Sequence, residues 1–197
     1  SLFMILLAAY AVVLARLAAK TEVVIGTPVA NRDWPETEAL IGLFAHYIPL
    51  RVDLQGDPTV RDLVGRVRRT SLDCYAHQRM PYQKIVEAAQ PDRIPGRAPL
   101  FQVALVLQNL PAIPLLLPGL EIEQLQIDRA TAKLDISVLL EEIGGTIHGE
   151  LEYSTDLFEA PMAARLARYL MRIADGFTQN PDCRVSQLPL LDTGERA

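Results

Sequence analysis

The sequence predicts an α+β fold, a two-layer sandwich in which helices pack on one face of a mixed β-sheet. Three observations support this prediction. An almost wholly apolar helical segment opens the chain, a Gly-Gly turn separates two strand-like segments, and apolar residues recur at helical spacing near the end. The predicted elements follow in the order helix, strand, strand, helix, further strands and a last helix, and this order favours helices on one face of a sheet. We expect one domain over residues 1–191 and the start of a linker over 192–197.

The opening segment, Leu2 to Ala15, is apolar and is broken by Arg16. It is shorter than the roughly 18 residues of a membrane span, and no basic stretch precedes it, so neither an anchor nor a signal peptide is expected. Residues 2–19 are instead predicted to form a helix buried on nearly all sides, with Ser1 as its N-cap. We expect further sequence upstream to cover this helix.

Two strands are expected next, joined by a loop. Residues 22–25 form a β-branched run that ends at Gly26, and residues 47–53 alternate between apolar and polar side chains. The breakers of the loop between them are Pro28, Asn31, Asp33 and Pro35.

Two helices should follow these strands. Asp57 as N-cap and Pro58 in the first turn begin a helix that runs to about Ala76. A short helix covers about residues 82–88, and the breaker-rich residues 91–99 are expected to form a loop.

The middle of the chain combines strands with an irregular segment. Residues 101–107 form a continuous apolar run, which predicts a central strand. Residues 109–119 contain three prolines and a glycine but are rich in leucine, so they should form an irregular segment that lies against another surface. Residues 120–127 alternate in part and indicate an edge strand, and a final strand is expected over 185–191.

The clearest local prediction is a hairpin. Gly144-Gly145 lies between residues 133–142 and 146–153, and such a pair provides the positive φ angles that a tight hairpin turn requires. Asp156 and Glu159 are predicted to cap the last long helix. The apolar stripe of that helix is Met162, Leu166, Tyr169, Leu170, Ile173 and Phe177.

Composition excludes several classes of function. The chain has 24 acidic and 19 basic residues and a formal net charge of −5, so its surface repels a phosphate backbone and nucleic acid is not expected as a partner. Cys74 and Cys183 lie far apart and form no CxxC or Cys/His metal spacing. We therefore expect two free thiols in a reducing cytosol and no metal site.

Six motifs follow one another along the chain. They are Gly26-Thr-Pro-Val-Ala-Asn-Arg32, Ile41-Gly-Leu-Phe-Ala-His-Tyr-Ile-Pro-Leu-Arg51, His77-Gln-Arg-Met-Pro-Tyr-Gln83, Arg93-Ile-Pro-Gly-Arg-Ala-Pro-Leu-Phe-Gln102, Lys133-Leu-Asp135 and Tyr153-Ser-Thr-Asp-Leu-Phe158. In order and spacing they resemble the C-terminal lobe of condensation domains of nonribosomal peptide synthetases, which belong to the chloramphenicol-acetyltransferase-like superfamily. The resemblance covers essentially the whole chain, and six motifs in order are far more specific than any one of them.

The chain also departs from the pattern of that family. The family usually has Asn-Thr where this chain has His46-Tyr47, and Asp and Phe-Glu where it has Arg79 and Tyr82-Gln83. The catalytic signature of the family is two histidines, three residues and then aspartate-glycine, whereas the three histidines here are not adjacent. The resemblance implies that the signature belongs to an N-terminal lobe and that this chain is inactive alone.

The resemblance implies an amide-forming reaction. An amine held on one carrier protein attacks an acyl or peptidyl thioester held on another, and the second histidine of the signature helps to position the amine and move its proton. No cofactor is expected to bind directly, because the substrates arrive on phosphopantetheine arms through a tunnel between two lobes. The implied partners are the N-terminal lobe, donor and acceptor peptidyl carrier proteins and a neighbouring adenylation domain, in the cytoplasm.

Arg32 is the first candidate site residue. The resemblance implies that it pairs with the aspartate of the signature across the lobes, because a buried carboxylate needs a cation or several donors; without the resemblance it is a surface arginine in a polar loop. The tunnel or motif positions are Gly26, Thr27, Pro28, Asn31, His46 and Asp135. The motif positions with an expected structural role are Gly42, Arg51, His77, Gln78, Pro81, Arg97 and Pro99.

Two loops are expected to meet the other lobe. Residues 28–38 resemble the floor loop that bridges to it. Residues 109–130 are in the position of the latch that crosses back, although a loop folded on its own sheet is an alternative.

Several polar residues allow two interpretations. His46 either hydrogen-bonds a pantetheine arm or the acceptor, or has a structural role. His77 is expected to end a helix, where a cationic ring complements the dipole, and His148 to be solvated on a polar strand face. Asp135, expected within a strand, either faces water or pairs near the tunnel. The basic helix side formed by Arg61, Arg66, Arg68 and Arg69 either docks an acidic carrier protein or is solvated.

Two other functions compete with this one. His46-Tyr47 and Arg79 favour a non-catalytic, condensation-like module that recruits partners. The chain is alternatively part of a coenzyme A-dependent acyltransferase whose site is completed across subunits, and a stable trimer in light scattering would favour that hypothesis.

Overall fold

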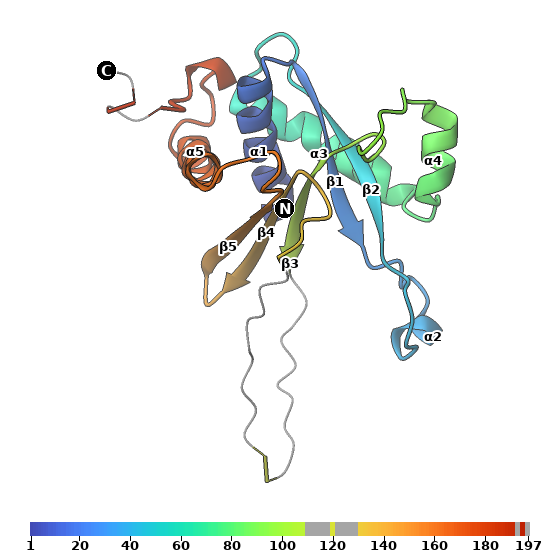
Figure 1. The fold of residues 1–197 in the computed structure, drawn as a ribbon. Helices are drawn as coiled ribbons and strands as arrows, with labels where there is room; N and C mark the ends of the chain where they lie inside the picture. The colour runs from blue at the N-terminus through green and yellow to red at the C-terminus, as the bar shows by residue number, and fades with distance from the viewer. Residues whose placement is uncertain (109–118, 121–129, 192–193, 196–197) are drawn as a thin grey trace.

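The computed structural model describes residues 1–108, 119–120, 130–191 and 194–195 (Figure 1). Its centre is a five-stranded sheet in the order β2-β1-β3-β4-β5. The strands are β1 (Glu22–Val29), β2 (His46–Asp53), β3 (Val103–Gln108), β4 (Ile136–Ile143) and β5 (Thr146–Tyr153). Because β3 is parallel to both β1 and β4 while the outer pairs are antiparallel, the sheet is mixed and β3 is central, as predicted.

One face of this sheet is apolar across all five strands. Strand alternation puts every second residue on the same side, and the pairing register brings these residues into continuous rows. The core residues on this face are Val23, Ile25, Val29, Ile48, Leu50, Val52, Val103, Leu105, Leu107, Ile136, Val138, Leu140, Leu151 and Tyr153.

Three long helices cover that face: α1 (Leu2–Ala18), α3 (Val60–Ala76) and α5 (Ala160–Gln179). Figure 1 shows α1 between α3 and α5, and it contacts both helices as well as β1. Ten of its residues are buried. The expectation that sequence upstream covers this helix was wrong, because α3, α5 and the sheet of this same chain bury it.

Strand β1 is longer than predicted. It continues through Pro28, which lies opposite Tyr47, to Val29 opposite His46. The described pairing of β1 with β3 is at Gly26 and Ala104, so β1 lies at a sheet edge beyond that point. A proline is tolerated there because no partner requires its missing N–H. The loop after β1 contains α2 (Pro35–Glu38), a single turn that the sequence did not predict.

Helix α3 begins later than predicted, and its cap is Thr59 rather than Asp57. The Thr59 hydroxyl accepts a hydrogen bond from the Asp62 N–H at 3.1 Å. The Asp57 carboxylate instead accepts bonds from the Ser186 N–H at 3.0 Å and the Ser186 hydroxyl at 2.7 Å. The true cap was missed because Asp57 and Thr59 are both good cap residues, and the tertiary contact with Ser186 occupies Asp57.

This cap gives a direct prediction. Thr59→Ala should lower the free energy of unfolding by about 1 kcal/mol, because the Asp62 N–H loses its acceptor. Thr59→Ser is the matched control and should stay within a few tenths of a kcal/mol of the wild type, because it keeps the hydroxyl. Chemical denaturation followed by circular dichroism measures both variants, and an equal loss in both would show that the methyl group rather than the cap is responsible.

The C-terminal third contains one confirmed and three corrected predictions. Gly144 and Gly145 have φ angles of +59° and +80° and join β4 to β5 as expected. Strand β4 begins after Asp135, which lies in a bend rather than in the strand. Helix α5 begins at Ala160, so Asp156 lies in the preceding turn and does not cap the helix.

Residues 185–191 form no strand. Val185–Gln187 is a 3₁₀ turn, and the carbonyls of Leu188 and Leu190 accept hydrogen bonds from Arg16 and Arg172. These arginines bind carbonyls that a neighbouring strand would need, so the segment is fastened to α1 and α5 instead. The edge strand and latch predicted over residues 109–130 lie outside the described residues except for positions 119, 120 and 130. In the part of the chain that the structure describes, no helix is long and apolar enough to cross a membrane.

Candidate functional site

The other face of the sheet carries small residues along its middle. Gly26 on β1 pairs with Ala104 on β3, Ala104 pairs with Ser137 on β4, and Ser137 pairs with Glu152 on β5. Alternation therefore puts these four residues in one row on the face away from α1, α3 and α5. Gly26, Ala104 and Ser137 are small and buried, so the groups that cover them lie close to the sheet.

An aromatic cluster covers one end of this row. The Phe101 ring lies directly over Gly26, since a Cβ atom at Gly26 would be 2.3 Å from the ring. The Phe101 ring centroid is 5.8 Å from that of Tyr47 and 5.6 Å from that of Tyr82, and the Tyr82 hydroxyl donates to the Pro99 carbonyl. The cluster thus joins β2, α4 (Tyr82–Ala89) and the loop before β3.

A small, mostly apolar hollow of about 330 Å³ opens beside this cluster. The polar groups at its rim come from His46, Gln83 and Lys133. Burial, followed by the negative charge of Glu152, raises the pKa of Tyr47 above its ordinary value. A tyrosine hydroxyl is neutral at physiological pH even without this shift, so Tyr47 can donate a hydrogen bond to a ligand.

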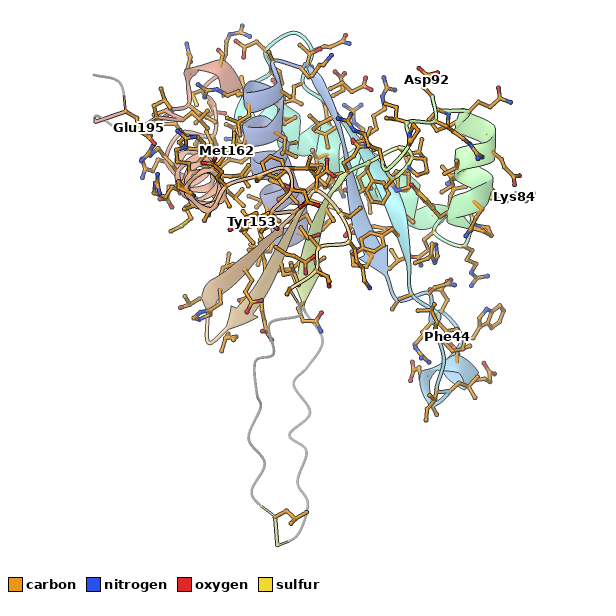
Figure 2. All side chains as sticks on the ribbon, in the orientation of Figure 1. Phe44, Lys84, Asp92, Tyr153, Met162 and Glu195 are labelled. Atoms are coloured by element: carbon orange, nitrogen blue, oxygen red, sulfur yellow. The ribbon has the colours of Figure 1, made fainter. Side chains whose placement is uncertain are left out.

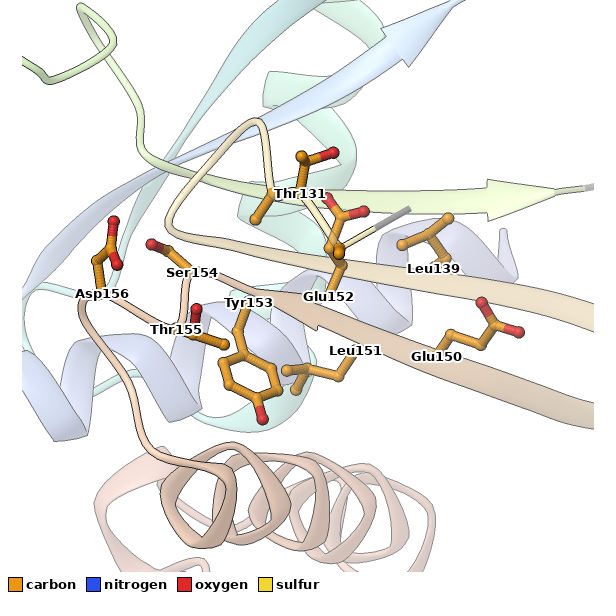
Figure 3. A pocket seen from close by; sticks show the side chains of 11 residues that line it. Thr131, Leu139, Glu150, Leu151, Glu152, Tyr153, Ser154, Thr155 and Asp156 are labelled. Atoms are coloured by element: carbon orange, nitrogen blue, oxygen red, sulfur yellow. The ribbon is translucent and has the colours of Figure 1, made fainter. Parts of the chain in front are cut away.

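A larger and more polar hollow of about 1080 Å³ lies along β5 and the turn after it (Figure 3). Figure 3 shows Tyr153 directed towards α5, while Glu152 points to the opposite side of the strand. The acidic lining residues are Glu150, Glu152 and Asp156, and the hydroxyl-bearing ones are Thr131, Tyr153, Ser154 and Thr155. This wall can accept hydrogen bonds from a ligand that carries N–H groups.

Arg32 lies in the loop between β1 and β2. Its guanidinium donates to the Thr37 carbonyl and, at 3.5 Å, to the Glu38 carbonyl, and it lies 4.3 Å above the centre of the Phe44 ring. Figure 2 labels Phe44 beside α2, beyond the ends of β1 and β2. Within this chain Arg32 therefore closes its own loop, and its pairing across two lobes stays a prediction.

The other tunnel candidates divide between the two faces of the sheet. Gly26 and Pro28 lie on the open face, whereas alternation puts Thr27, which is 3 % exposed, on the face covered by the helices. Asn31 has a left-handed φ of +52°, which asparagine tolerates better than most residues. Asp135 is half-buried, and its main chain bonds to Gln102 and Ser154 rather than forming part of β4.

The histidines have three different environments. The His46 ring nitrogen Nε2 lies 2.7 Å from the Gln78 carbonyl, which joins β2 to the turn after α3. His77 is the C-cap residue of α3, with Nδ1 2.9 Å from the Asp73 carbonyl. His148 is exposed on β5. In the described residues they are not brought together.

The remaining motif positions mainly support loops. Arg51 forms an ion pair with Glu22 across β1 and β2, and that hydrogen bond lowers the pKa of the Glu22 carboxyl. Gly42 lies against the Phe44 ring and Pro81 precedes α4 as its N-cap residue. The Pro99 carbonyl accepts hydrogen bonds from the Tyr82 hydroxyl and the Phe101 N–H. The Gln78 side-chain amide donates to the Asp33 carboxylate. Arg97 is exposed in a turn.

The basic side of α3 is partly neutralised. Arg61 forms an ion pair with Asp182 at 2.8 Å, and Arg66 lies 3.6 Å from the Asp53 carboxylate and donates to the carbonyls of Asp53 and Gln55. Arg68 and Arg69 are exposed. Among the described residues no group of three or more His, Cys, Asp or Glu side chains could hold a metal ion.

Sequence reasoning missed two features of this region. It did not predict that Phe101 covers Gly26, or that Asp33 and Trp34 contact Gln78 and Arg79. The aromatic residues stood inside the recognised motifs, but nothing in the spacing shows which of them meet. Contacts between segments far apart in sequence depend on the sheet register, which sequence patterns leave open.

Comparison with known proteins identifies the family to which this fold belongs. The family model for the condensation domain matches residues 1–197, the entire chain. This chain belongs to the condensation-domain family. The sequence-based prediction of that family, and of its mixed sheet with helices, is thereby confirmed.

The curated relatives of this condensation-domain chain are large synthetases. It is 41 % identical to malpinin synthetase from Mortierella alpina over 196 aligned residues, and 39 % identical to a dimodular nonribosomal peptide synthase from Bacillus subtilis over 204. The alignments cover 100 % of this chain but 2 % and 8 % of those proteins.

Solved structures give the same fold. A four-domain nonribosomal peptide synthetase bound to AMP and glycine matches with a TM-score of 0.88 at 25 % identity, over 98 % of this chain and 16 % of that one. The X-domain in complex with OxyB from teicoplanin biosynthesis matches with a TM-score of 0.85 at 32 % identity, over 98 % of this chain and 43 % of that one. This chain therefore corresponds to less than half of the X-domain chain.

Proposed function

We propose that this chain is the C-terminal lobe of a nonribosomal peptide synthetase condensation domain, which forms an amide between an acyl or peptidyl thioester and an aminoacyl amine, both held on carrier proteins. One observation carries the proposal: the condensation-domain family model matches the entire chain, yet the chain covers only 43 % of the X-domain chain with the same fold. An N-terminal lobe with the histidine motif would supply the remainder. His46, His77 and His148 lie in three separate environments, so this lobe alone is expected to be inactive.

The reaction moves one proton and exchanges one bond for another. The amine nitrogen of the acceptor attacks the thioester carbonyl carbon, and an oxyanion develops on the carbonyl oxygen. The carbon–sulfur bond then breaks, the new carbon–nitrogen bond remains as the amide, and the proton lost by the amine is delivered to the departing thiolate. A histidine of the N-terminal lobe would mediate that transfer.

This lobe would contribute walls and donors to that reaction. The open sheet face offers the neutral Tyr47 hydroxyl beside the small hollow, and the acceptor-rich wall along β5 suits the amide N–H groups of a phosphopantetheine arm. The partners would be the N-terminal lobe, donor and acceptor carrier proteins that bring these arms, and a neighbouring adenylation domain in the cytoplasm. Large multidomain relatives support that setting.

Arg32 provides a test of the lobe's role. In a domain assembled from this chain and a histidine-bearing N-terminal lobe, Arg32→Ala should lower kcat/KM for carrier-dependent amide formation about tenfold, as expected for the loss of a charge-assisted hydrogen bond of about 1.5 kcal/mol. Arg165→Ala removes an exposed arginine on α5 as the matched control. Amide formation by this chain alone, or full activity of the Arg32→Ala domain, would refute the respective parts of the proposal.

A second function has one specific observation in its favour. The X-domain, 32 % identical to this chain, was solved as a complex with OxyB, so a condensation-like domain can bind a separate protein. A non-catalytic module that recruits a partner protein is therefore the competing proposal. An assembled domain with an intact histidine motif that binds a partner but forms no amide from loaded carrier proteins would favour it.

A further inference from the structure

Two segments that lie 45 residues apart in the sequence meet at one carboxylate. Asp33, in the loop between β1 and β2, accepts a hydrogen bond from the Arg79 side chain at 2.9 Å on one oxygen. Its other oxygen accepts a bond from the Gln78 side-chain amide at 3.0 Å. Gln78 and Arg79 belong to the turn between α3 and α4, so the loop is joined to that turn through both oxygens of Asp33.

The neighbouring residues strengthen the same junction. The Arg79 guanidinium lies 5.1 Å from the centre of the Trp34 ring, a distance at which a cation is attracted to the aromatic face. The Gln78 carbonyl lies 2.7 Å from His46 at the start of β2. The ion pair with Asp33, the cation–π contact with Trp34 and the hydrogen bond with His46 therefore all involve residues 78 and 79, and they reach these residues from two sides of the loop.

The rest of this loop is exposed. Figure 1 shows α2 projecting beyond the ends of β1 and β2. Ile41 and Leu43 are 105 % and 95 % exposed, and Leu40 is also exposed. Such apolar residues are unfavourable in water unless another surface meets them. Arg32 bonds within the same loop, so its position depends on what holds the loop to the body of the lobe.

We propose that Asp33 and Arg79 are positioning residues, which clamp this loop to the α3–α4 turn and thereby present Arg32 and the apolar tip to the partner lobe. The inference rests on the proposed function for its kinetic consequence, but the clamp itself is a property of this chain. Because the clamp acts through the loop, neither residue is required to touch the substrates.

The size of the effect separates a clamp from a general stabilising contact. The side chains of Arg79 and Asp33 are 62 % and 30 % exposed, and ion pairs at such surfaces change an equilibrium by at most about fivefold. A shift of that size is small against the stability of a whole domain but large for a loop with few anchors. Loss of the clamp should therefore change the loop while leaving global unfolding nearly unaltered.

Trp34 reports on the clamp directly, because it is the single tryptophan of the sequence. The Trp34 side chain is already 59 % exposed, so its anisotropy is the informative signal: in the 197-residue chain Arg79→Gln should lower it, and high salt should have the same direction of effect on the wild type. Arg79→Lys keeps the cation and should retain most of the wild-type signal. Arg69→Gln is the matched control on α3 and should leave the signal unchanged. Wild-type anisotropy in Arg79→Gln would overturn the clamp.

The kinetic arm uses the domain assembled with a histidine-bearing lobe. Arg79→Gln should lower kcat about fivefold with little change in KM for the loaded carrier proteins, and Arg79→Lys should restore most of the rate. A changed Trp34 signal with wild-type kcat would refute the positioning role. If the wild-type assembly formed no amide, the proposed function would fail, whereas the Trp34 response would still decide whether the clamp exists.

Discussion

Leu7→Ala is expected to lower the free energy of unfolding of this chain by about 2–5 kcal/mol. Leu7 lies on α1 and is 1 % exposed, among residues of the core that α1, α3, α5 and the sheet share. Removing its isobutyl group takes buried apolar surface away and leaves a cavity that rigid neighbours fill incompletely. Chemical denaturation followed by circular dichroism measures the change, with the midpoint and slope compared between variants.

The control for this substitution lies on the same helix. Leu17 is 46 % exposed, so Leu17→Ala removes the same atoms from a site that water already reaches. Its effect should stay within about 0.5 kcal/mol. If both variants lost equal stability, or if Leu7→Ala were harmless, then α1 would not be packed in the core of this lobe and would need a surface from elsewhere.

This pair of variants also tests what the sequence could not settle. A helix that is apolar on all sides must be buried, and that much followed from residues 2–19 alone. The identity of the covering surface did not follow, because helical periodicity records burial without naming a partner. In the structure the neighbours of α1 are α3 and α5, which come from segments much further along the chain.

Local features were predictable to the extent that local chemistry determined them. Gly144-Gly145 specified its hairpin, because the turn and both strands lie within one short segment. Strand β1 was extended by pairing with β2, and Asp57 was taken from its predicted cap role by Ser186. The last two cases involve distant residues, whose contacts override local preference.

The candidate site shows the same difference between features set by local sequence, which were predictable, and contacts between distant residues, which were not. The motif residues were identifiable by resemblance, yet the contact between Asp33 and Arg79 and the cover of Gly26 by Phe101 depend on how the sheet and the α3–α4 turn are placed. Arg32 shows the remaining gap most clearly. Its proposed partner would lie in another lobe, whereas its described contacts are all within its own loop.

Gly26→Ala should destabilise the chain by about 2–3 kcal/mol, the second large effect that the structure predicts. A Cβ atom at this position would lie 2.3, 2.6 and 2.7 Å from three atoms of the Phe101 ring. Phe101 is 4 % exposed and packed against Tyr47 and Tyr82, so any turn of the ring disturbs these aromatic contacts. Either the ring or the backbone of β1 must move, and Gly26 is the residue at which β1 pairs with β3.

A second glycine provides a control for which the expected change in stability has the opposite sign. Gly65 lies within α3, and a Cβ atom there would meet nothing within 4 Å, so Gly65→Ala should raise the free energy of unfolding by about 0.5–1 kcal/mol. Phe101→Leu in the Gly26→Ala background supplies the mechanism, because a smaller side chain makes room for the new methyl group. The double variant should then be more stable than the sum of the two single losses implies, and strict additivity would mean that the ring is not what excludes a side chain at Gly26.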